Sequence, residues 1–209
     1  MELGGSSTRP EIKGRARARI GEGVIENGEI KDEKRLAALL KKLFAAGKPH
    51  KISTKDIVFG LPESLTFIQH ITLGEHSSRE RESLIRHELL SRLPIEESSL
   101  IFSYIVLRNT KKETNILAVG LDRGVFIAWR DFLKKYKFDV EIFDIESLAV
   151  FRDLDIDIKS PVCVVDIGKA TTRVSVFNKK GLVFNYTVQR AGDYLTRAIV
   201  NGTKLEKEA

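Results

Sequence analysis

The 209-residue chain has one cysteine, one tryptophan and four histidines, and it has no long apolar run. A single cysteine excludes a disulfide framework within the chain, and the apolar surroundings of Cys163 predict a buried, inert thiol. The histidines are not spaced like metal ligands and have no cysteine partners. No apolar run approaches the roughly 18 residues that span a bilayer, and the N-terminus does not read as a signal peptide.

The excess of basic residues is small and spread along the chain. Lys and Arg number 35 against 29 Asp and Glu, for a net charge of +6. Such a charge can attract nucleic acid or an anionic membrane surface. However, basic and acidic residues are interleaved, and only residues 13–19 form a basic cluster. Nucleic acid is therefore not the expected partner, and the ordinary apolar content predicts a folded globular protein.

Hydrophobic spacing predicts a β–α–β arrangement in the first part of the chain. The apolar residues at helical spacing are Leu36, Leu39, Leu40, Leu43 and Phe44. Asp32 is the expected N-cap of this helix, and Gly47 and Pro49 are expected to end it. Residues 55–60 then form a short buried strand. Residues 1–19 contain a glycine-hydroxyl bend with no strand before it, which favours a disordered tail.

The middle of the chain predicts a compact α+β unit of its own. Ser77 and Glu80 have the spacing of a capping box, which predicts a helix that stops before Pro94. The expected order is β-α-β-β-α, with strands at 66–73, 100–107 and 115–121 and a second helix at about 124–136. A strand at 140–145 and a short helix at 147–154 then lead to the last part of the chain.

The stretch from Val162 to Phe177 predicts two strands joined by a polar bend. Asp166 and Gly168 end the first strand, and Thr171 and Thr172 precede the second. Backbone N–H groups and hydroxyls gathered in one bend can bind phosphate oxygens. Asp166 can hold Mg²⁺ through water. A plain β-hairpin with a polar tip explains the same residues, because short motifs match by chance.

A third strand at 182–188 leads into a second glycine motif. Ala191-Gly192-Asp193 opens a helix in which Leu195 and Ile199 are expected to face inward. The N-terminus of a helix offers unpaired N–H groups to an anion. Gly192 is therefore a second candidate for contact with phosphate.

Taken together, these landmarks resemble PilM, an actin-like family of type IV pilus assembly that is related to the cell-division protein FtsA. Residues 2–9, Glu-Leu-Gly-Gly-Ser-Ser-Thr-Arg, look like the first phosphate loop of the family. Residues 166–172 look like its second phosphate loop, and residues 191–196 look like its Gly-Gly-x-x-Leu-Thr motif. Gly28-Glu-Ile30 and Leu93-Pro94-Ile95-Glu96 match further landmarks at similar spacing.

The resemblance implies an α/β, actin-like (ribonuclease-H-like) fold with an inserted α+β subdomain and an incomplete second lobe. The implied domains are a first subdomain at 1–63, the insert at 64–142, a return to the first subdomain at 143–160, and the start of the second lobe at 161–209. The residues implied to bind ATP are Gly4, Ser6, Ser7, Asp166, Gly168, Thr171, Thr172 and Gly192, with Asp166 also holding Mg²⁺.

The resemblance also implies a partner and a place in the cell. In the family, a short cytoplasmic segment of the inner-membrane protein PilN docks beside the first subdomain and the insert. The implied location is cytoplasmic, at the inner face of the cytoplasmic membrane, with contact to the membrane only through the partner. Self-association is left open.

Departures from the family pattern argue against tight ATP binding. Glu2 stands where the family's first loop has Asp, and Pro10 is expected to interrupt the strand that should follow, since proline cannot donate to a central ladder. The chain ends before the acidic and lysine residues with which the family holds the ribose, as expected of either a fragment or a shortened form. ATP and Mg²⁺ are therefore expected to bind weakly or not at all, without turnover.

Two other kinds of actin-like protein fit the sequence less well. An FtsA-like division protein needs an amphipathic C-terminal helix, which is not found in this sequence. A sugar kinase needs a catalytic carboxylate beside a substrate pocket, and no such constellation is found. The sequence therefore favours a pilus assembly adaptor over either alternative.

Overall fold

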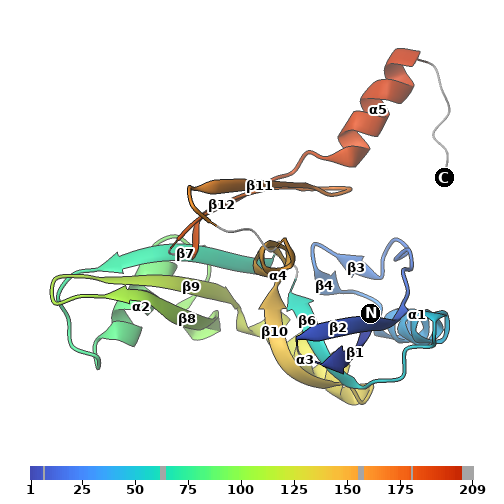
Figure 1. Ribbon diagram of the computed structural model, residues 1–209, viewed down its shortest axis with the longest axis horizontal. Helices are drawn as coiled ribbons and strands as arrows, with labels where there is room; N and C mark the ends of the chain where they lie inside the picture. The colour runs from blue at the N-terminus through green and yellow to red at the C-terminus, as the bar shows by residue number, and fades with distance from the viewer. Residues whose placement is uncertain (7, 62–64, 155–157, 180, 204–209) are drawn as a thin grey trace. The chain divides into compact units, whose positions relative to one another are not determined.

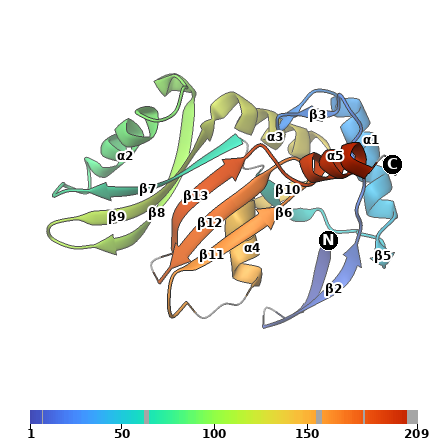
Figure 2. The same ribbon diagram turned by 90° about the horizontal axis from the view of Figure 1, so that it is seen from above.

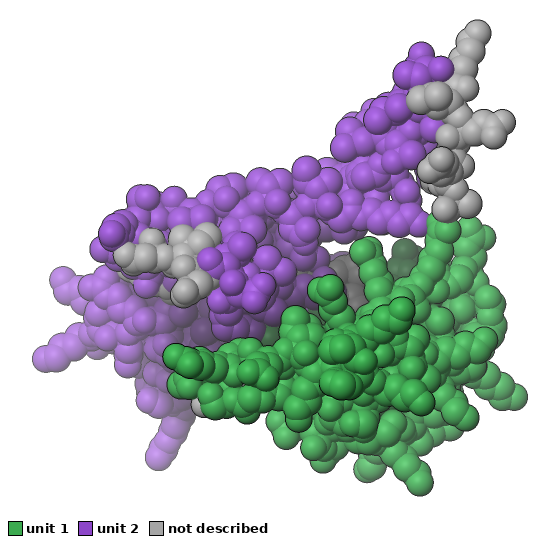
Figure 3. All heavy atoms as spheres, turned by 45° about the vertical axis from the view of Figure 1, so that its right-hand side comes forward, with its two compact units in different colours: residues 1–65, 122–145 green, residues 66–121, 146–209 purple. Residues whose placement is uncertain are grey.

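The computed structural model of the protein describes residues 1–6, 8–61, 65–154, 158–179 and 181–203. Figures 1 and 2 show its helices and strands from two directions. The chain forms two compact units, each assembled from two separate segments (Figure 3). Unit 1 contains residues 1–65 and 122–145, and unit 2 contains residues 66–121 and 146–209.

Unit 1 is a mixed α/β unit. In chain order its elements are β1 (Glu2–Ser6), β2 (Arg9–Arg15), β3 (Ile25–Glu26), β4 (Glu29–Ile30), α1 (Glu33–Ala45), β5 (Lys48–Pro49), β6 (Asp56–Leu61), α3 (Arg123–Lys135) and β10 (Asp139–Ile145). Strands β6 and β10 pair in parallel, β3 pairs with β4, and β1, β2 and β5 form a third sheet in that order. Helix α1 begins as predicted, because Oδ1 of Asp32 accepts the N–H of Arg35 at 2.9 Å.

The core of unit 1 joins α1 to α3. Trp129 and Phe132 of α3 pack with Leu36 of α1 and with Val24. Nε1–H of Trp129 also donates to the carbonyl of Gly28 at 2.8 Å. Helix α3 thus belongs with the N-terminal segment in this packing, whereas the sequence pattern favours a place in the insert. The predicted domain boundaries stay a prediction, and the packing favours an insert that ends near residue 121.

Unit 2 contains two three-stranded sheets. Its elements are β7 (Thr66–Leu73), α2 (Arg81–Leu90), the 3-10 helix η2 (Glu97–Ser99), β8 (Leu100–Asn109), β9 (Thr114–Asp122), α4 (Glu146–Asp153), β11 (Val162–Ile167), β12 (Thr172–Asn178), β13 (Gly181–Val188) and α5 (Gly192–Thr203). The strand orders are β7-β9-β8 and β11-β12-β13. The predicted capping box is only half formed, because α2 begins at Arg81 and the Glu80 carboxylate accepts the N–H of Ser77 at 2.8 Å.

Strand β9 is buried on both of its faces. Because side chains alternate along a strand, Ile116 and Ala118 face the cluster that also contains Ile85 and Leu89 of α2. Leu117 faces the other way and packs with Phe177 of β12 and Leu182 of β13. The residues of the predicted insert therefore share a core with the last sheet of unit 2.

The last sheet has the predicted arrangement, with β12 paired antiparallel to both β11 and β13 (Figure 2). Helix α4 lies against one face of it, where the rings of Phe151 and Phe177 stack at 3.6 Å. Cys163, Val165 and Ile167 point to the opposite face and are exposed. The prediction of a buried thiol is therefore wrong, because β11 is the edge strand and its second face has no helix over it among the residues described.

No helix in the described part of the chain is both long enough and apolar enough to cross a membrane.

Candidate functional site

The second predicted phosphate loop is a tight turn between β11 and β12. Asp166 pairs with Arg173 across the two strands, and Ile167 pairs with Thr172. The N–H of Gly168 donates to the carbonyl of Thr171 at 2.9 Å and closes the turn. The loop therefore keeps Asp166 and Thr171 at the same edge of the sheet, as the sequence predicts.

The start of α5 is packed against this loop. The N–H of Gly192 donates to the carbonyl of Gly168 at 3.0 Å, and the N–H of Asp193 donates to the carbonyl of Lys169 at 2.8 Å. A Cβ at Gly192 would lie 3.2 Å from the Gly168 oxygen, so glycine permits this close approach. The prediction that the N–H of Gly192 is unpaired is wrong, because loop carbonyls occupy the place predicted for an anion.

The remaining donors of the loop are few. Thr172 donates its hydroxyl to the carbonyl of Arg190 at 2.7 Å. Among the described residues, the hydroxyl of Thr171 and the N–H groups of Lys169, Ala170 and Thr171 find no hydrogen-bond acceptor. These four groups are the backbone and hydroxyl donors that the turn can offer to a phosphate.

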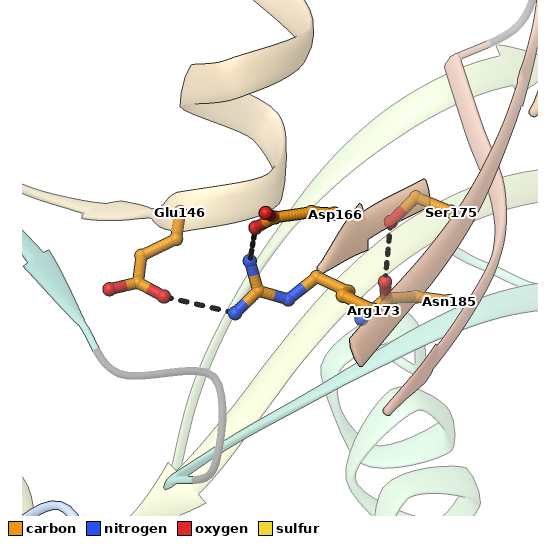
Figure 4. Close-up of polar contacts among 5 residues, drawn as sticks. All are labelled: Glu146, Asp166, Arg173, Ser175 and Asn185. Atoms are coloured by element: carbon orange, nitrogen blue, oxygen red, sulfur yellow. Dashed lines mark hydrogen bonds and ion pairs between the residues drawn. The ribbon is translucent and has the colours of Figure 1, made fainter. Parts of the chain in front are cut away.

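Arg173 occupies the centre of the site and was not predicted as a site residue (Figure 4). Its Nη1 lies 3.3 Å from Oδ2 of Asp166, and its Nη2 lies 3.0 Å from Oε2 of Glu146. The Arg173 side chain is only 11% exposed, against 49% for Asp166 and 47% for Glu146. The sequence could have identified it, because Arg173 lies on the same face of β12 as Ser175 and Phe177. An arginine that faces inward requires charged or polar partners.

The arrangement gives little support to a protein-built metal site. No group of three or more His, Cys, Asp or Glu side chains that could hold a metal occurs among the residues described. Mg²⁺ needs few protein ligands when a phosphate supplies others, so a single carboxylate can serve through water. Asp166 fits that role only in part, because Arg173 already neutralises one of its oxygens.

The first predicted loop is the turn of the β1–β2 hairpin in unit 1, and Ser7 lies outside the described residues. Gly4 and Ser6 belong to β1, and Oγ of Ser6 accepts the N–H of Arg9 at 3.1 Å. The predictions of a disordered tail and of a strand interrupted at Pro10 are wrong. Strand β2 runs through Pro10, which is tolerated because β5 pairs with β2 only at Gly14 and Arg15.

Glu2 connects this hairpin to the segment before β6. Its carboxylate accepts the N–H groups of Ser53 at 2.6 Å and Thr54 at 3.2 Å. These hydrogen bonds, that of Ser53 first, lower the pKa of Glu2 below its ordinary value of 4.5. The Glu2 carboxylate therefore connects two backbone segments of unit 1.

This role predicts a pH-dependent effect of Glu2→Gln. A carboxylate whose pKa is lowered by folding stabilises the folded state above its unfolded pKa, and it loses that effect as the pH falls through the folded value. We expect Glu2→Gln to lower the urea midpoint at neutral pH, and we expect this difference from the unsubstituted chain to shrink as the pH falls below 4.5 and through the lowered pKa of Glu2. Glu11→Gln, at an exposed position of β2, is the matched control. If the two substitutions lower the urea midpoint equally at neutral pH, the hydrogen bonds of Glu2 to Ser53 and Thr54 do not stabilise the fold as proposed.

The chain has an actin-like fold. It superposes on a solved structure of a PilM-PilN type IV pilus biogenesis complex with a TM-score of 0.82 at 16% identity, covering 98% of this chain and 62% of that one. The cytoplasmic domain of EpsL, an inner-membrane component of the type II secretion system of Vibrio cholerae, aligns with a TM-score of 0.52 at 16% identity, covering 76% of this chain and 57% of that one. At this identity the likeness defines the fold alone.

The sequence itself identifies the family. Residues 2–209 match the family described as type IV pilus assembly protein PilM, and the chain belongs to that family. No curated protein matches the chain by sequence. The chain spans less than two thirds of the length of the two solved structures.

Proposed function

We propose that this chain serves as the actin-like adaptor of a type IV pilus machine and docks the cytoplasmic segment of a PilN-like inner-membrane protein. The match to the PilM family over residues 2–209 carries the proposal. The related structure is that of a PilM-PilN complex, which supports the choice of partner. Through that partner the protein would act at the inner face of the cytoplasmic membrane.

The outer edge of the insert sheet is the docking surface that we favour. Strand β8 is the last strand of the order β7-β9-β8, so one of its edges has no neighbouring strand among the described residues. Ile105 is 57% exposed and Val106 is 40% exposed on this strand. An exposed apolar edge strand can accept an extended peptide as an additional strand.

The test uses point substitutions, because deleting the insert would remove Leu117 from the core that it shares with Phe177 and Leu182. We expect the double variant Ile105→Lys/Val106→Lys to weaken binding of the partner segment at least about tenfold, since charges on an edge strand oppose strand addition. Calorimetry with the cytoplasmic segment of the PilN-like protein from the same organism measures this.

The matched control is Val165→Lys/Ile167→Lys, which places the same charges on the exposed face of β11. Binding that is lost only in the β8 variant supports the docking surface. Binding that survives in both variants excludes β8 as the docking surface but still supports a PilN-like partner. If the unsubstituted chain does not bind the segment, the proposed function itself is contradicted.

Nucleotide is the second part of the proposal. We assign weak phosphate contacts to the turn around Gly168 and Thr171, with Asp166 and Thr172 as the neighbouring candidates. Gly4 and Ser6 of the β1–β2 hairpin in unit 1 are separate candidates. The support is the family and the unoccupied donors of the turn. ATP turnover by this chain is not expected.

A further inference from the structure

A second surface, in unit 1, has no role in the proposed function. A groove of about 600 Å³ lies along α1, the segment before β6 and the segment after α3. Its lining residues are Lys34, Ala37, Ala38, Leu40, Lys41, Phe44, Ile52, Ser53, Lys55, Tyr136 and Phe138. A concave surface of this size is large enough to enclose several side chains of a ligand.

The shape of the groove follows from the sequence of α1. Lys34 and Lys41 are seven residues apart and therefore lie on one face of the helix. The small side chains of Ala37 and Ala38 lie between them and leave a depression in that face. Half-buried aromatic rings line the depression, with the rings of Phe44 and Phe138 5.3 Å apart.

The charge of the groove is of one sign. Three lysines and no acidic side chain line it in the described part of the chain. None of Lys34, Lys41 and Lys55 forms an ion pair with another described residue. Nζ of Lys55 lies 4.5 Å from the ring centroid of Phe138 and 5.4 Å from that of Phe44, which holds this cation over the apolar part of the groove.

We infer that this groove binds an acidic peptide segment that places aliphatic or aromatic side chains in the depression and carboxylates against the lysines. Charge complementarity selects the acidic partner, because three unpaired cations attract carboxylates and repel basic segments. The concave apolar part selects a peptide side chain over a flat bilayer surface. The Phe44 and Phe138 rings are tilted by 55° to each other, which offers no flat platform for stacked bases.

The test lets the chain select its own ligand from displayed random peptides. The selected peptides are expected to combine Asp or Glu with Leu, Ile or Phe. The variant Lys34→Glu/Lys41→Glu is expected to bind them at least about tenfold more weakly, which corresponds to about 1.4 kcal/mol. The control Lys111→Glu/Lys112→Glu changes charge by the same amount on the loop between β8 and β9 and should bind them unchanged.

A second variant separates shape from charge. Ala38→Arg fills the depression while adding a positive charge, so it should also weaken binding if the depression receives a side chain. Ala38 is exposed on α1 and arginine has a good helix propensity, so the fold should persist, which thermal unfolding checks. Stronger binding by Ala38→Arg would show that charge alone attracts the peptide.

Four outcomes would overturn the inference. The first is a set of selected peptides that is free of acidic residues, and the second is equal binding of the peptides by the Lys34→Glu/Lys41→Glu variant. The third is binding of phosphatidylcholine and phosphatidylglycerol vesicles through the same lysines, which would make the groove a lipid site. The fourth is a dimer in sedimentation that Ala38→Arg dissociates, which would place a second copy of the chain in the groove.

Discussion

Replacing Phe177 with alanine is expected to destabilise the protein by about 3 to 5 kcal/mol, the usual cost of removing a buried phenyl ring. Phe177 has no exposed surface. Its ring stacks on Phe151 of α4 and packs with Leu117 of β9 and Leu182 of β13. The substitution thus opens a cavity where three elements of unit 2 meet.

Phe184→Ala provides the matched control for this prediction. It makes the same chemical change in the same sheet, but Phe184 of β13 is 52% exposed. Its effect should stay below about 1 kcal/mol, since little area is removed from water there. Urea unfolding followed by circular dichroism measures both variants. Equal effects would contradict the shared core of the insert and the last sheet.

The sequence predicted correctly those helices and strands that depend on contacts between residues near in sequence. The apolar spacing of α1 and its cap at Asp32 need only neighbouring residues, and both are confirmed. The order β11-β12-β13 follows from two turn signals between three apolar runs, because short turns connect antiparallel neighbours. These features depend on contacts that are near in sequence.

Contacts between distant residues were not predictable from the same signals. The spacing of α3 shows that one face is apolar, but it does not show that Trp129 packs with Val24 and Leu36. Similarly, an alternating strand does not show which of its faces a helix will cover, and Cys163 lies on the uncovered one.

The residues of the candidate site also fall into those predictable from nearby sequence and those that depend on distant contacts. Gly168, Thr171 and Asp166 were found because one turn brings them together in sequence. The contact of Arg173 with Glu146 joins residues that are 27 positions apart. The donation of the Gly192 N–H to Gly168 likewise depends on how α5 packs, which the sequence motif does not encode.

These contacts bear directly on nucleotide binding. Hydrogen bonds to charged phosphate contribute about 1.5 to 3 kcal/mol each. The N–H groups of Gly192 and Asp193 are already used by the loop. Losing two such bonds costs about 3 to 6 kcal/mol, or roughly a hundredfold to ten-thousandfold in affinity. We therefore expect this chain to bind Mg-ATP weakly or not at all in titration calorimetry, and to show no ATP hydrolysis.

Asp166→Asn distinguishes the two roles open to this carboxylate. If Asp166 mainly neutralises Arg173, the substitution frees one edge of the guanidinium for phosphate, and residual ATP binding should stay equal or become stronger. If Asp166 holds Mg²⁺, binding should be lost instead. Asp153→Asn, at an exposed position of α4, is the control.

Micromolar ATP binding that Asp166→Asn abolishes would contradict our expectation. The Asp166→Asn variant should still bind the partner segment. The proposed docking surface is on β8, whereas Asp166 belongs to β11.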